Sequence, residues 1–471
     1  MVRYIYPGAN TTFTFENGTV LALENVGKVK GDFTGVTDGA SFYQKFCSVS
    51  SGASSAADSV SAADVVTPGY PTPIEITDDN IVSGYYLDGQ GFEDVAVISL
   101  LAFESESPLE FQQVAQKFFA DAVKAGKTKL VIDLSANGGG YILQGYDLFR
   151  QLFPDIVQDG FSRFRENDML LAIAKIYSDY IPADYDPNTA SANTIAIYEN
   201  FFNYRYDLNL TNQPFESFDA KFAPLKFKGD SFTNYLRWNL DDPLTTSNST
   251  FGLGTDITGY GSRKNFTQPF KAENIIMLMD GYCASTCTLF AEMMRIQGGV
   301  KTIAMGGRPK VGPIQGVGGI KGAQILGWGE IYSNAQEALS LGTATPEQTT
   351  ALNRLTNLPV QRSSSNGINV RDQILRDNVN DGLPAQFVVE EADCRLYYTL
   401  PMITDVTALW KSAASSAFNG GKCAAGSLPK REVDTTVKRS VVSQPEMRQT
   451  IKRDAPKDRL WDLRHGRKVI A

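Results

Sequence analysis

Short apolar runs alternate with an amphipathic stretch after residue 94. Residues 95–101 and 130–134 are almost entirely apolar, which is typical of strands buried on both faces of a parallel sheet. Between them, apolar residues recur at helical spacing from 111 to 122. A strand, helix and strand in this order predict two parallel strands joined by a right-handed crossover.

The same pattern returns later in the chain. Residues 275–280 predict another buried strand, followed by a helix over about 284–297 and a strand at 300–305. The long stretch 155–272 is rich in Tyr, Phe, Asn and Asp and has few clean periodicities. The pattern therefore predicts an α/β fold that carries a large irregular insertion.

Two local signals add detail. Asn17-Gly18 lies between alternating apolar residues, which predicts a β-hairpin near the N-terminus. Ser107-Pro108-Leu109-Glu110 predicts a capping box with proline at the first helical position.

Changes in composition suggest domain boundaries. A Ser/Ala-rich stretch followed by three prolines predicts a linker or exposed loop. The last 48 residues carry 12 Lys/Arg against 6 Asp/Glu, which predicts a solvated, basic, disordered tail; a removable or partner-binding extension is the alternative. The predicted regions are a strand-rich and turn-rich N-terminal remnant (1–47), a linker (48–85), a catalytic domain (86–423) with its insertion (155–272), and the tail (424–471).

Composition and charge exclude several classes of function. The apolar fraction of 42% is sufficient for a sizeable core. A net charge of -8 argues against nucleic-acid partners, and no apolar run approaches the roughly 20 residues that span a bilayer. The single histidine, His465, excludes a multi-histidine metal site. We therefore expect no metal, no cofactor, no nucleic acid and no membrane contact.

The compartment is ambiguous from the residues alone. The first residues lack the cationic and apolar regions of a signal peptide, but five Asn-x-Ser/Thr sequons are present. Five cysteines allow two bridges and leave one thiol over. Cys283 and Cys287 are expected to form a local disulfide or packed thiols, and Cys394 and Cys423 to tie the C-terminal strands. Bridges are favoured only in a secreted protein.

Candidate chemistry lies at the ends of two predicted strands. Residues 133–140 (DLSANGGG) follow the first, and three glycines allow a tight turn with exposed backbone N–H groups that could hold an oxyanion. Residues 280–292 (DGYCASTCTLFAE) follow the second and place Ser285 at a strand-to-helix elbow. Each feature alone also fits a structural role, as a glycine-rich helix entry or a serine N-cap.

Together the two segments are more specific. They resemble the tail-specific, or C-terminal-processing, serine peptidases (family forty-one of the serine peptidases), most closely a fungal branch similar to chlamydial protease-like activity factor. Segments at 3–12, 306–313 and 392–399 match as well. The resemblance covers about residues 1–423 and implies a crotonase/ClpP-like core of ββα units, a secreted glycoprotein, and hydrolysis of a peptide or protein substrate.

Carried over to this chain, the resemblance makes Ser285 the nucleophile. The backbone N–H groups of Gly138 or Gly139 and of Thr286 would form the oxyanion hole. Hydrolysis would pass through an acyl-enzyme on Ser285. The substrate would be a secreted or ribosomally made precursor peptide.

The general base is where this chain departs from the family. The related branch uses a histidine upstream in an N-terminal domain, and this chain has none before residue 465. Three readings follow: the chain is truncated at its N-terminus, a second chain supplies the missing domain, or the protein is an inactive pseudopeptidase that binds peptides. Substitute groups within the chain are weaker candidates. They are Lys310 or His465 as base, and Asp372, Asp377 or Glu390 as acid.

A crotonase-like acyl-CoA enzyme would use the same glycine-loop oxyanion hole. It would not need a serine elbow, and consumption of a thioester would distinguish it from a peptidase.

Overall fold

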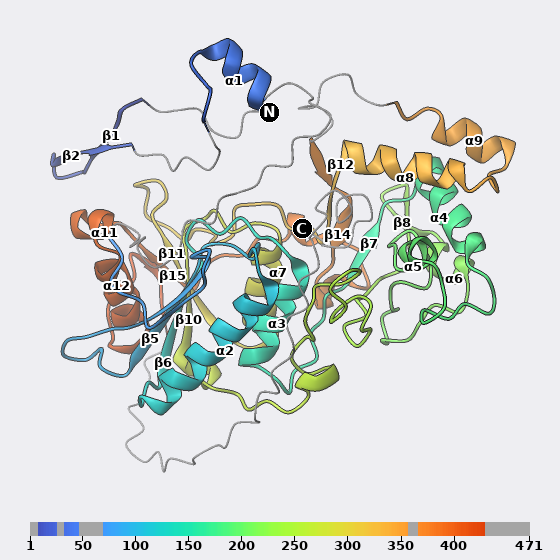
Figure 1. The fold of residues 1–471 in the computed structure, drawn as a ribbon. Coiled ribbons are helices and arrows are strands. Elements are labelled where there is room, and N and C mark those ends of the chain that lie inside the picture. Colours follow the sequence, from blue (N-terminus) through green and yellow to red (C-terminus); the bar gives the residue numbers. More distant parts are fainter. Residues whose placement is uncertain (1–7, 26–32, 47–68, 357–365, 429–471) are drawn as a thin grey trace.

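A mixed eight-stranded sheet forms the centre of the molecule (Figure 1). The computed structural model describes residues 8–25, 33–46, 69–356 and 366–428. In spatial order, the strands are β16 (Ala425–Gly426), β15 (Cys394–Leu396), β11 (Lys301–Met305), β10 (Ile275–Met279), β6 (Lys129–Asp133), β5 (Val95–Leu100), β4 (Val82–Tyr86) and β3 (Glu75–Ile76).

The five inner strands, from β15 to β5, run parallel, and the outer pairs are antiparallel. Every residue of β5 and β10 is buried, as their apolar runs predict. The four parallel strands β5, β6, β10 and β11 that the sequence predicts are confirmed. The predicted α/β class is confirmed as well, and the central sheet is mixed.

Helices cover both faces of this sheet. On one face lie α2 (Pro108–Lys124), α3 (Ile142–Leu152) and α7 (Thr286–Glu292), which continues as a short π-helical segment (Met293–Gln297); on the other lies α12 (Val406–Phe418) (Figure 1). Side chains of successive residues in each strand point to opposite faces of the sheet. Ile98 therefore packs in the core on the α2 side, and Val97 packs in the core on the α12 side.

The start of α2 shows half of the predicted capping box. Ser107 Oγ accepts a hydrogen bond from the Glu110 N–H at 3.3 Å. The Glu110 carboxylate instead accepts from the N–H of Asp78, 32 residues earlier. A tertiary contact has replaced the local half of the motif.

The segment 69–85 corrects the predicted linker. It contributes β3 and β4 to the central sheet, and only residues 48–68 of the predicted linker lie outside the described residues. The prolines suggested a loop here, but the chain beyond them pairs into the sheet, and Gly84 of β4 packs against α2. A Cβ at Gly84 would sit 2.1 Å from the Phe118 ring of α2, so glycine lets the helix approach the strand.

A second layer is built from the 155–272 stretch and later segments. Its sequence predicts irregular structure, but the stretch contains ordered helices and strands. One of its helices packs against two later helices, at 328–340 and 346–352, and one of its strands pairs with a later strand at 371–373. The remaining elements of this layer are β7 (Ser162–Phe164), α4 (Asp168–Tyr180), α5 (Ala192–Tyr198), α6 (Phe218–Phe222), β8 (Leu225–Phe227), β9 (Asp230–Phe232), two 3-10 turns (Gly261–Arg263, Ala272–Asn274), β12 (Ile325–Gly327), α8 (Trp328–Ser340), α9 (Pro346–Leu352), β13 (Gly367–Asn369) and β14 (Arg371–Gln373).

A fully buried ion cluster ties this layer together. The carboxylate of Asp207 accepts from Lys221 Nζ and from Arg371 Nη2, each at 2.8 Å, and all three side chains have no exposed surface. Asp207 and Lys221 belong to the 155–272 stretch, and Arg371 belongs to a later segment. Separating the two segments would leave a buried charge unpaired, which is strongly destabilising.

The N-terminal hairpin is confirmed. β1 (Asn10–Thr14) pairs antiparallel with β2 (Val20–Glu24), and α1 (Gly39–Phe46) follows. Cys47 and the basic segment from residue 429 onward lie outside the described residues. Two 3-10 turns (Arg376–Asn378, Ala385–Phe387) and α11 (Leu400–Thr404) complete the described elements.

None of the helices in the described residues has both the length and the apolar character needed to cross a membrane. Within the same residues, His, Cys, Asp and Glu side chains form no group of three or more that could hold a metal ion.

Candidate active site

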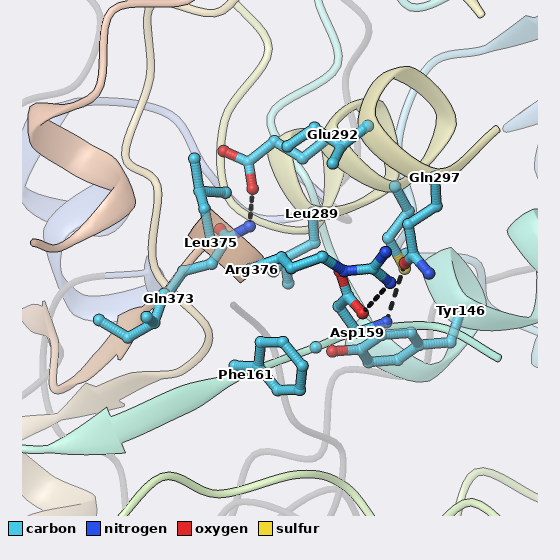
Figure 2. A pocket seen from close by; sticks show the side chains of 13 residues that line it. Tyr146, Asp159, Phe161, Leu289, Glu292, Gln297, Gln373, Leu375 and Arg376 are labelled. Atoms are coloured by element: carbon cyan, nitrogen blue, oxygen red, sulfur yellow. Dashed lines mark hydrogen bonds and ion pairs between the residues drawn. The ribbon is translucent and has the colours of Figure 1, made fainter. Parts of the chain in front are cut away.

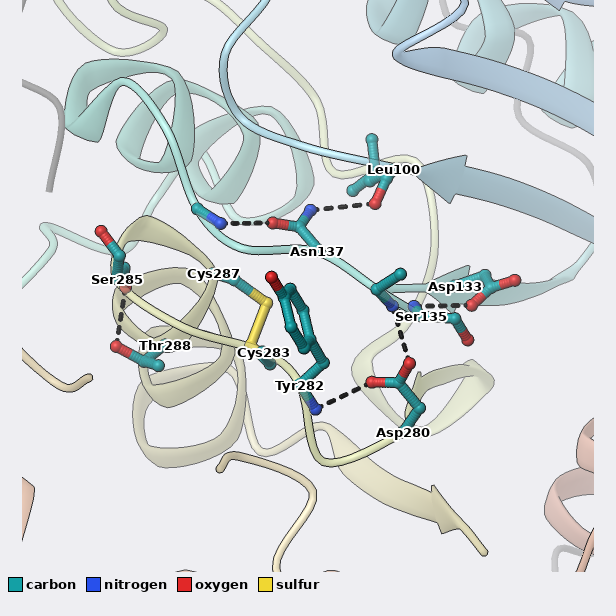
Figure 3. The surroundings of a disulfide bond; sticks show 12 residues. Leu100, Asp133, Ser135, Asn137, Asp280, Tyr282, Cys283, Ser285, Cys287 and Thr288 are labelled. Carbon is teal, nitrogen blue, oxygen red and sulfur yellow. Dashed lines mark hydrogen bonds between the residues drawn. A yellow bond between two sulfur atoms is a disulfide. The ribbon is translucent and has the colours of Figure 1, made fainter. Parts of the chain in front are cut away.

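The two segments that carry the chemistry follow neighbouring parallel strands. Asp133 at the end of β6 pairs with Leu278 of β10, and the N–H of Leu134 donates to the Leu278 carbonyl at 2.9 Å. Because parallel strands end at the same edge of a sheet, the glycine loop and the serine elbow leave the sheet side by side (Figure 3).

Ser285 occupies the N-cap position of α7 in an unusual backbone conformation. Its φ is 62° and its ψ is -126°, a region that residues with a side chain rarely adopt. The residue is 5% exposed, and its Oγ has no hydrogen-bond partner among the described residues. The hydroxyl is therefore held at a strained turn and is free of the N-capping role, which was the alternative for this serine.

Backbone hydrogen bonds hold this turn on both sides. The Ser285 N–H donates to the carbonyl of Ile320 at 2.6 Å, and the Ser285 carbonyl accepts from the N–H and Oγ1 of Thr288. Cys283 forms a parallel bridge with Val317. The glycine-rich 306–322 segment thus runs along the elbow.

Gly139 lies directly against the elbow. A Cβ built on Gly139 would sit 2.6 Å from Ser285 Cβ and 2.8 Å from the Thr286 backbone nitrogen. Gly139 also has a φ of 97°, which favours glycine. The two motifs therefore meet around one hydroxyl, as the sequence predicts.

The structure distinguishes among the predicted oxyanion donors. The Gly139 N–H donates to Asn137 Oδ1 at 2.9 Å and is not available. In the described part of the chain, the N–H groups of Gly138 and Thr286 donate to no protein atom. Thr286 is also the first residue of α7, where the helix dipole favours negative charge. Of the three predicted donors, Gly138 and Thr286 are thus the two whose N–H groups have no protein partner among the described residues.

Side chains that the sequence analysis did not single out position the two loops. Asp280 accepts from the Ala136 N–H at 2.8 Å and from the Tyr282 N–H at 2.9 Å, so one carboxylate joins the glycine turn to the elbow (Figure 3). Asn137 donates to the Leu100 carbonyl, and Thr286 Oγ1 donates to the Gly140 carbonyl. All three residues lie inside the two motifs, and this was the one sequence feature that could have pointed to their role in positioning the loops.

Of the two arrangements expected for Cys283 and Cys287, the structure shows the disulfide (Figure 3). Cys394 and Cys423 are also bridged, as expected, and tie β15 to the segment before β16.

The four candidate bases and acids do not gather at Ser285. Lys310 is exposed, and Asp377 is exposed in the turn Arg376–Asn378. Asp372 pairs with Arg163 at 3.3 Å, and burial raises the pKa of its carboxyl. The hydrogen bonds and ion pairs of these residues in the described chain do not include Ser285. His465 lies outside the described residues.

Glu390 belongs to a buried charge cluster near the end of α7. Its carboxylate pairs with Arg295 at 2.8 Å and with Lys321 at 3.2 Å. Burial and the neighbouring Glu390 raise the pKa of Glu292 well above its ordinary value, and Glu292 accepts a hydrogen bond from Gln373. Sequence patterns do not reveal this cluster, because its members come from four separate segments.

A pocket lies beside this cluster (Figure 2). Glu292 and Leu289 of α7 line it together with Tyr146 of α3, and an Asp159–Arg376 ion pair lies in its wall. Ser285 is not among its lining residues, so this pocket does not expose the hydroxyl.

Comparison with known proteins identifies the family. Residues 94–312 match peptidase family S41. The chain is 32% identical over 460 residues to the peptidase S41 family protein ustP of Aspergillus flavus, covering 89% of this chain and 91% of that protein. It is 31% identical over 397 residues to the peptidase S41 family protein phomP1 of Diaporthe leptostromiformis, covering 74% of this chain and 56% of that protein. The chain therefore belongs to peptidase family S41.

Solved structures with a similar arrangement include mature CPAF, at 12% identity and a TM-score of 0.38 over 86% of this chain and 66% of that one. The photosystem II D1 C-terminal processing protease is 12% identical, with a TM-score of 0.28 over 72% of this chain and 53% of that one.

Proposed function

We propose that this peptidase acts through Ser285 as nucleophile, with an acyl-enzyme intermediate. The observation that carries the proposal is the close approach of Gly139 to Ser285 and Thr286, which sets the glycine loop, with the free N–H of Gly138, against the elbow that carries the free N–H of Thr286. A strained elbow with adjacent backbone donors is the arrangement that acyl transfer requires.

In the proposed reaction, Ser285 Oγ attacks the carbonyl carbon of the scissile peptide bond, and its proton passes to a general base. The carbonyl oxygen becomes an oxyanion stabilised by the N–H groups of Gly138 and Thr286. The carbon–nitrogen bond then breaks, and the amine leaves with the proton from the base. Water hydrolyses the resulting ester, releases the acid and restores the hydroxyl.

The base is the part that the described residues do not supply. Two of the candidates, Asp372 and Glu390, form ion pairs with other residues, and the other two, Lys310 and Asp377, are exposed. Ser285 Oγ forms no hydrogen bond with any of the described residues. The proposal therefore includes a histidine from outside the described residues, supplied by a longer chain or by a second chain. A peptide-binding pseudopeptidase is the competing function, and the unpartnered Oγ is the observation that favours it.

The resemblance supports three finer proposals. The fold would have a crotonase/ClpP-like core, the protein would be a secreted glycoprotein, and the substrate would be a secreted or ribosomally made precursor peptide. Two disulfides support an oxidising compartment. Intact-mass analysis of the protein secreted by its natural host would test the second of these proposals.

A fluorophosphonate probe tests the nucleophile directly. We expect it to label the folded protein at Ser285, and Ser285→Ala to abolish the labelling and lower turnover of a peptide library by about 1000-fold or more. Ser416→Ala is the matched control, because Ser416 is also buried but lies on α12, across the sheet.

The outcomes separate the two functions. Labelling that persists in Ser285→Ala would contradict the proposed nucleophile. Tight peptide binding by a folded protein that neither turns over peptides nor reacts with the probe would establish the pseudopeptidase.

A further inference from the structure

The serine elbow is enclosed by a covalent ring. The Cys283–Cys287 disulfide spans four residues, with Cα atoms 5.4 Å apart, and Ala284, Ser285 and Thr286 lie between the two cysteines. Both cysteines are fully buried in the core on the face of the sheet that α2, α3 and α7 cover. The bridge thus encloses the one residue whose hydroxyl the reaction uses.

The backbone inside the ring is strained and needs to be held. Ser285 has a positive φ, and such conformations persist only when the surroundings over-determine them. Gly281, four residues before Ser285, also has a positive φ of 83° and gives the approach to the elbow conformational freedom.

The hydrogen bonds of the elbow give a partial restraint. On the helix side, the Ser285 carbonyl receives the Thr288 and Leu289 N–H groups, and the Cys287 N–H donates to the Ala284 carbonyl. On the strand side, contacts come from the glycine-rich segment, where Gly319 donates to the Cys283 carbonyl. The disulfide joins these two sides across Ser285.

We infer that the Cys283–Cys287 disulfide is a positioning element of the catalytic machinery, which keeps Ser285 at its positive φ so that Oγ faces the Gly138 and Thr286 donors. This inference rests on the proposed function. It deepens that proposal by assigning the two cysteines a role in orientation, separate from their contribution to global stability.

The second bridge shows why stability alone is a poor account of the first. Cys394–Cys423 closes a sequence separation of 29 residues, compared with four for Cys283–Cys287. Because the unfolded chain loses more entropy when a longer loop is closed, the distant bridge should contribute more to stability. The short bridge is the one placed around the nucleophile.

The test compares two double variants. Cys283→Ala/Cys287→Ala removes the elbow bridge, and Cys394→Ala/Cys423→Ala removes the distant one as the matched control. The measurements are kinact and KI for the fluorophosphonate probe, expressed per folded molecule, and the melting temperature. Cys283→Val/Cys287→Ala serves as a second elbow variant that refills part of the vacated space.

We expect the elbow variants to lose about 100-fold in kinact with KI changed by less than about two-fold, since a small misplacement of a reacting group costs this much. The control should keep its kinact but lose more in melting temperature. Unchanged kinact in the folded elbow variants, or an equal loss in the control, would overturn the inference.

Hydrogen exchange keeps this test separate from the proposed function. The Thr288 and Leu289 amides both donate to the Ser285 carbonyl and report on the elbow without any reaction. We expect them to exchange at least about ten-fold faster in Cys283→Ala/Cys287→Ala than in the unchanged protein. If the unchanged protein is not labelled by the probe, the proposed function fails. In that case, equal exchange rates would also overturn the disulfide's positioning role.

Discussion

The groups considered for catalysis fall into two sets that are built in different ways. The backbone set consists of Gly138, Gly139 and Thr286, which lie on two loops that follow adjacent strands and meet where Gly139 approaches Ser285. The side-chain set consists of Lys310, Asp372, Asp377 and Glu390. Its members lie on separate segments, exposed or paired with other charges. The backbone set is assembled, whereas the side-chain set is not.

The difference shows which features of the fold bring the members of each set together. Loops that follow neighbouring parallel strands are brought together by the sheet itself, so the sheet assembles the donors. A general base needs one side chain within hydrogen-bond reach of Oγ, and many distant contacts decide whether that occurs. Four variants test this contrast.

The largest expected effect comes from Gly139→Ala. The added Cβ would meet Ser285 Cβ, the Ala284 carbonyl and the Thr286 nitrogen within 2.8 Å, all of them close to the backbone. We expect labelling and turnover to fall by about 1000-fold, because the collision would push the glycine loop, and with it the Gly138 donor, away from the elbow. Probe labelling and peptide turnover, both per folded molecule, measure this effect.

Gly229→Ala is the matched control for Gly139→Ala. Gly229 has a similar φ of 89°, but a Cβ there would meet nothing within 4 Å. It therefore carries the backbone strain without the collision. Equal losses of activity in both variants would show that strain, rather than the contact with the elbow, is responsible.

Asp280→Asn should have the next largest effect. An amide can accept from only one of the Ala136 and Tyr282 N–H groups through its oxygen, so one link between the glycine turn and the elbow is lost. We expect kcat to fall about 10-fold with KM nearly unchanged.

Asp186→Asn is the control for Asp280→Asn, because it changes an exposed aspartate that accepts from the Asn188 N–H in a distant turn. A change in KM alone at position 280 would contradict the positioning role.

Glu292→Gln tests the buried charge cluster through stability. The folded protein holds the pKa of Glu292 well above its ordinary value, so the folded state favours the protonated form. The resulting stability is present below the ordinary pKa and is lost as pH rises through the raised one. Between about pH 5 and pH 9, the unchanged protein should lose more unfolding free energy than Glu292→Gln.

Urea unfolding across this pH range measures the effect. Glu347→Gln is the control, because hydrogen bonds from its own backbone N–H and from the Thr345 side chain lower the pKa of Glu347, so its contribution is constant over the same range. Parallel pH profiles for the unchanged protein and Glu292→Gln would refute the prediction.

Lys310→Ala should have the smallest effect. The side chain is exposed on a loop, so we expect kcat/KM to stay within about two-fold of the unchanged protein. A loss of 100-fold or more in kcat/KM, with a shifted pH profile, would contradict this prediction and identify Lys310 as the base.

Local patterns were enough to predict the strands β5, β6, β10 and β11 and the meeting of the glycine loop with Ser285. Buried parallel strands carry a strong apolar signal, and neighbouring strands deliver their loops to one edge. Tertiary contacts account for the rest. Residues 75–85 fall in the predicted linker, but Gly84 lets Phe118 pack on this strand, and the Glu110 carboxylate accepts from the Asp78 N–H instead of completing the capping box.

The buried cluster of Glu292, Glu390 and Lys321 could not be predicted for the same reason. These residues are far apart in sequence, and each alone resembles an ordinary surface charge. Burial and pairing depend on which segments the fold places next to each other, and sequence spacing does not encode that arrangement. Backbone geometry around Ser285 follows from local sequence and strand order, whereas the environments of Glu292, Glu390 and Lys321 depend on long-range packing.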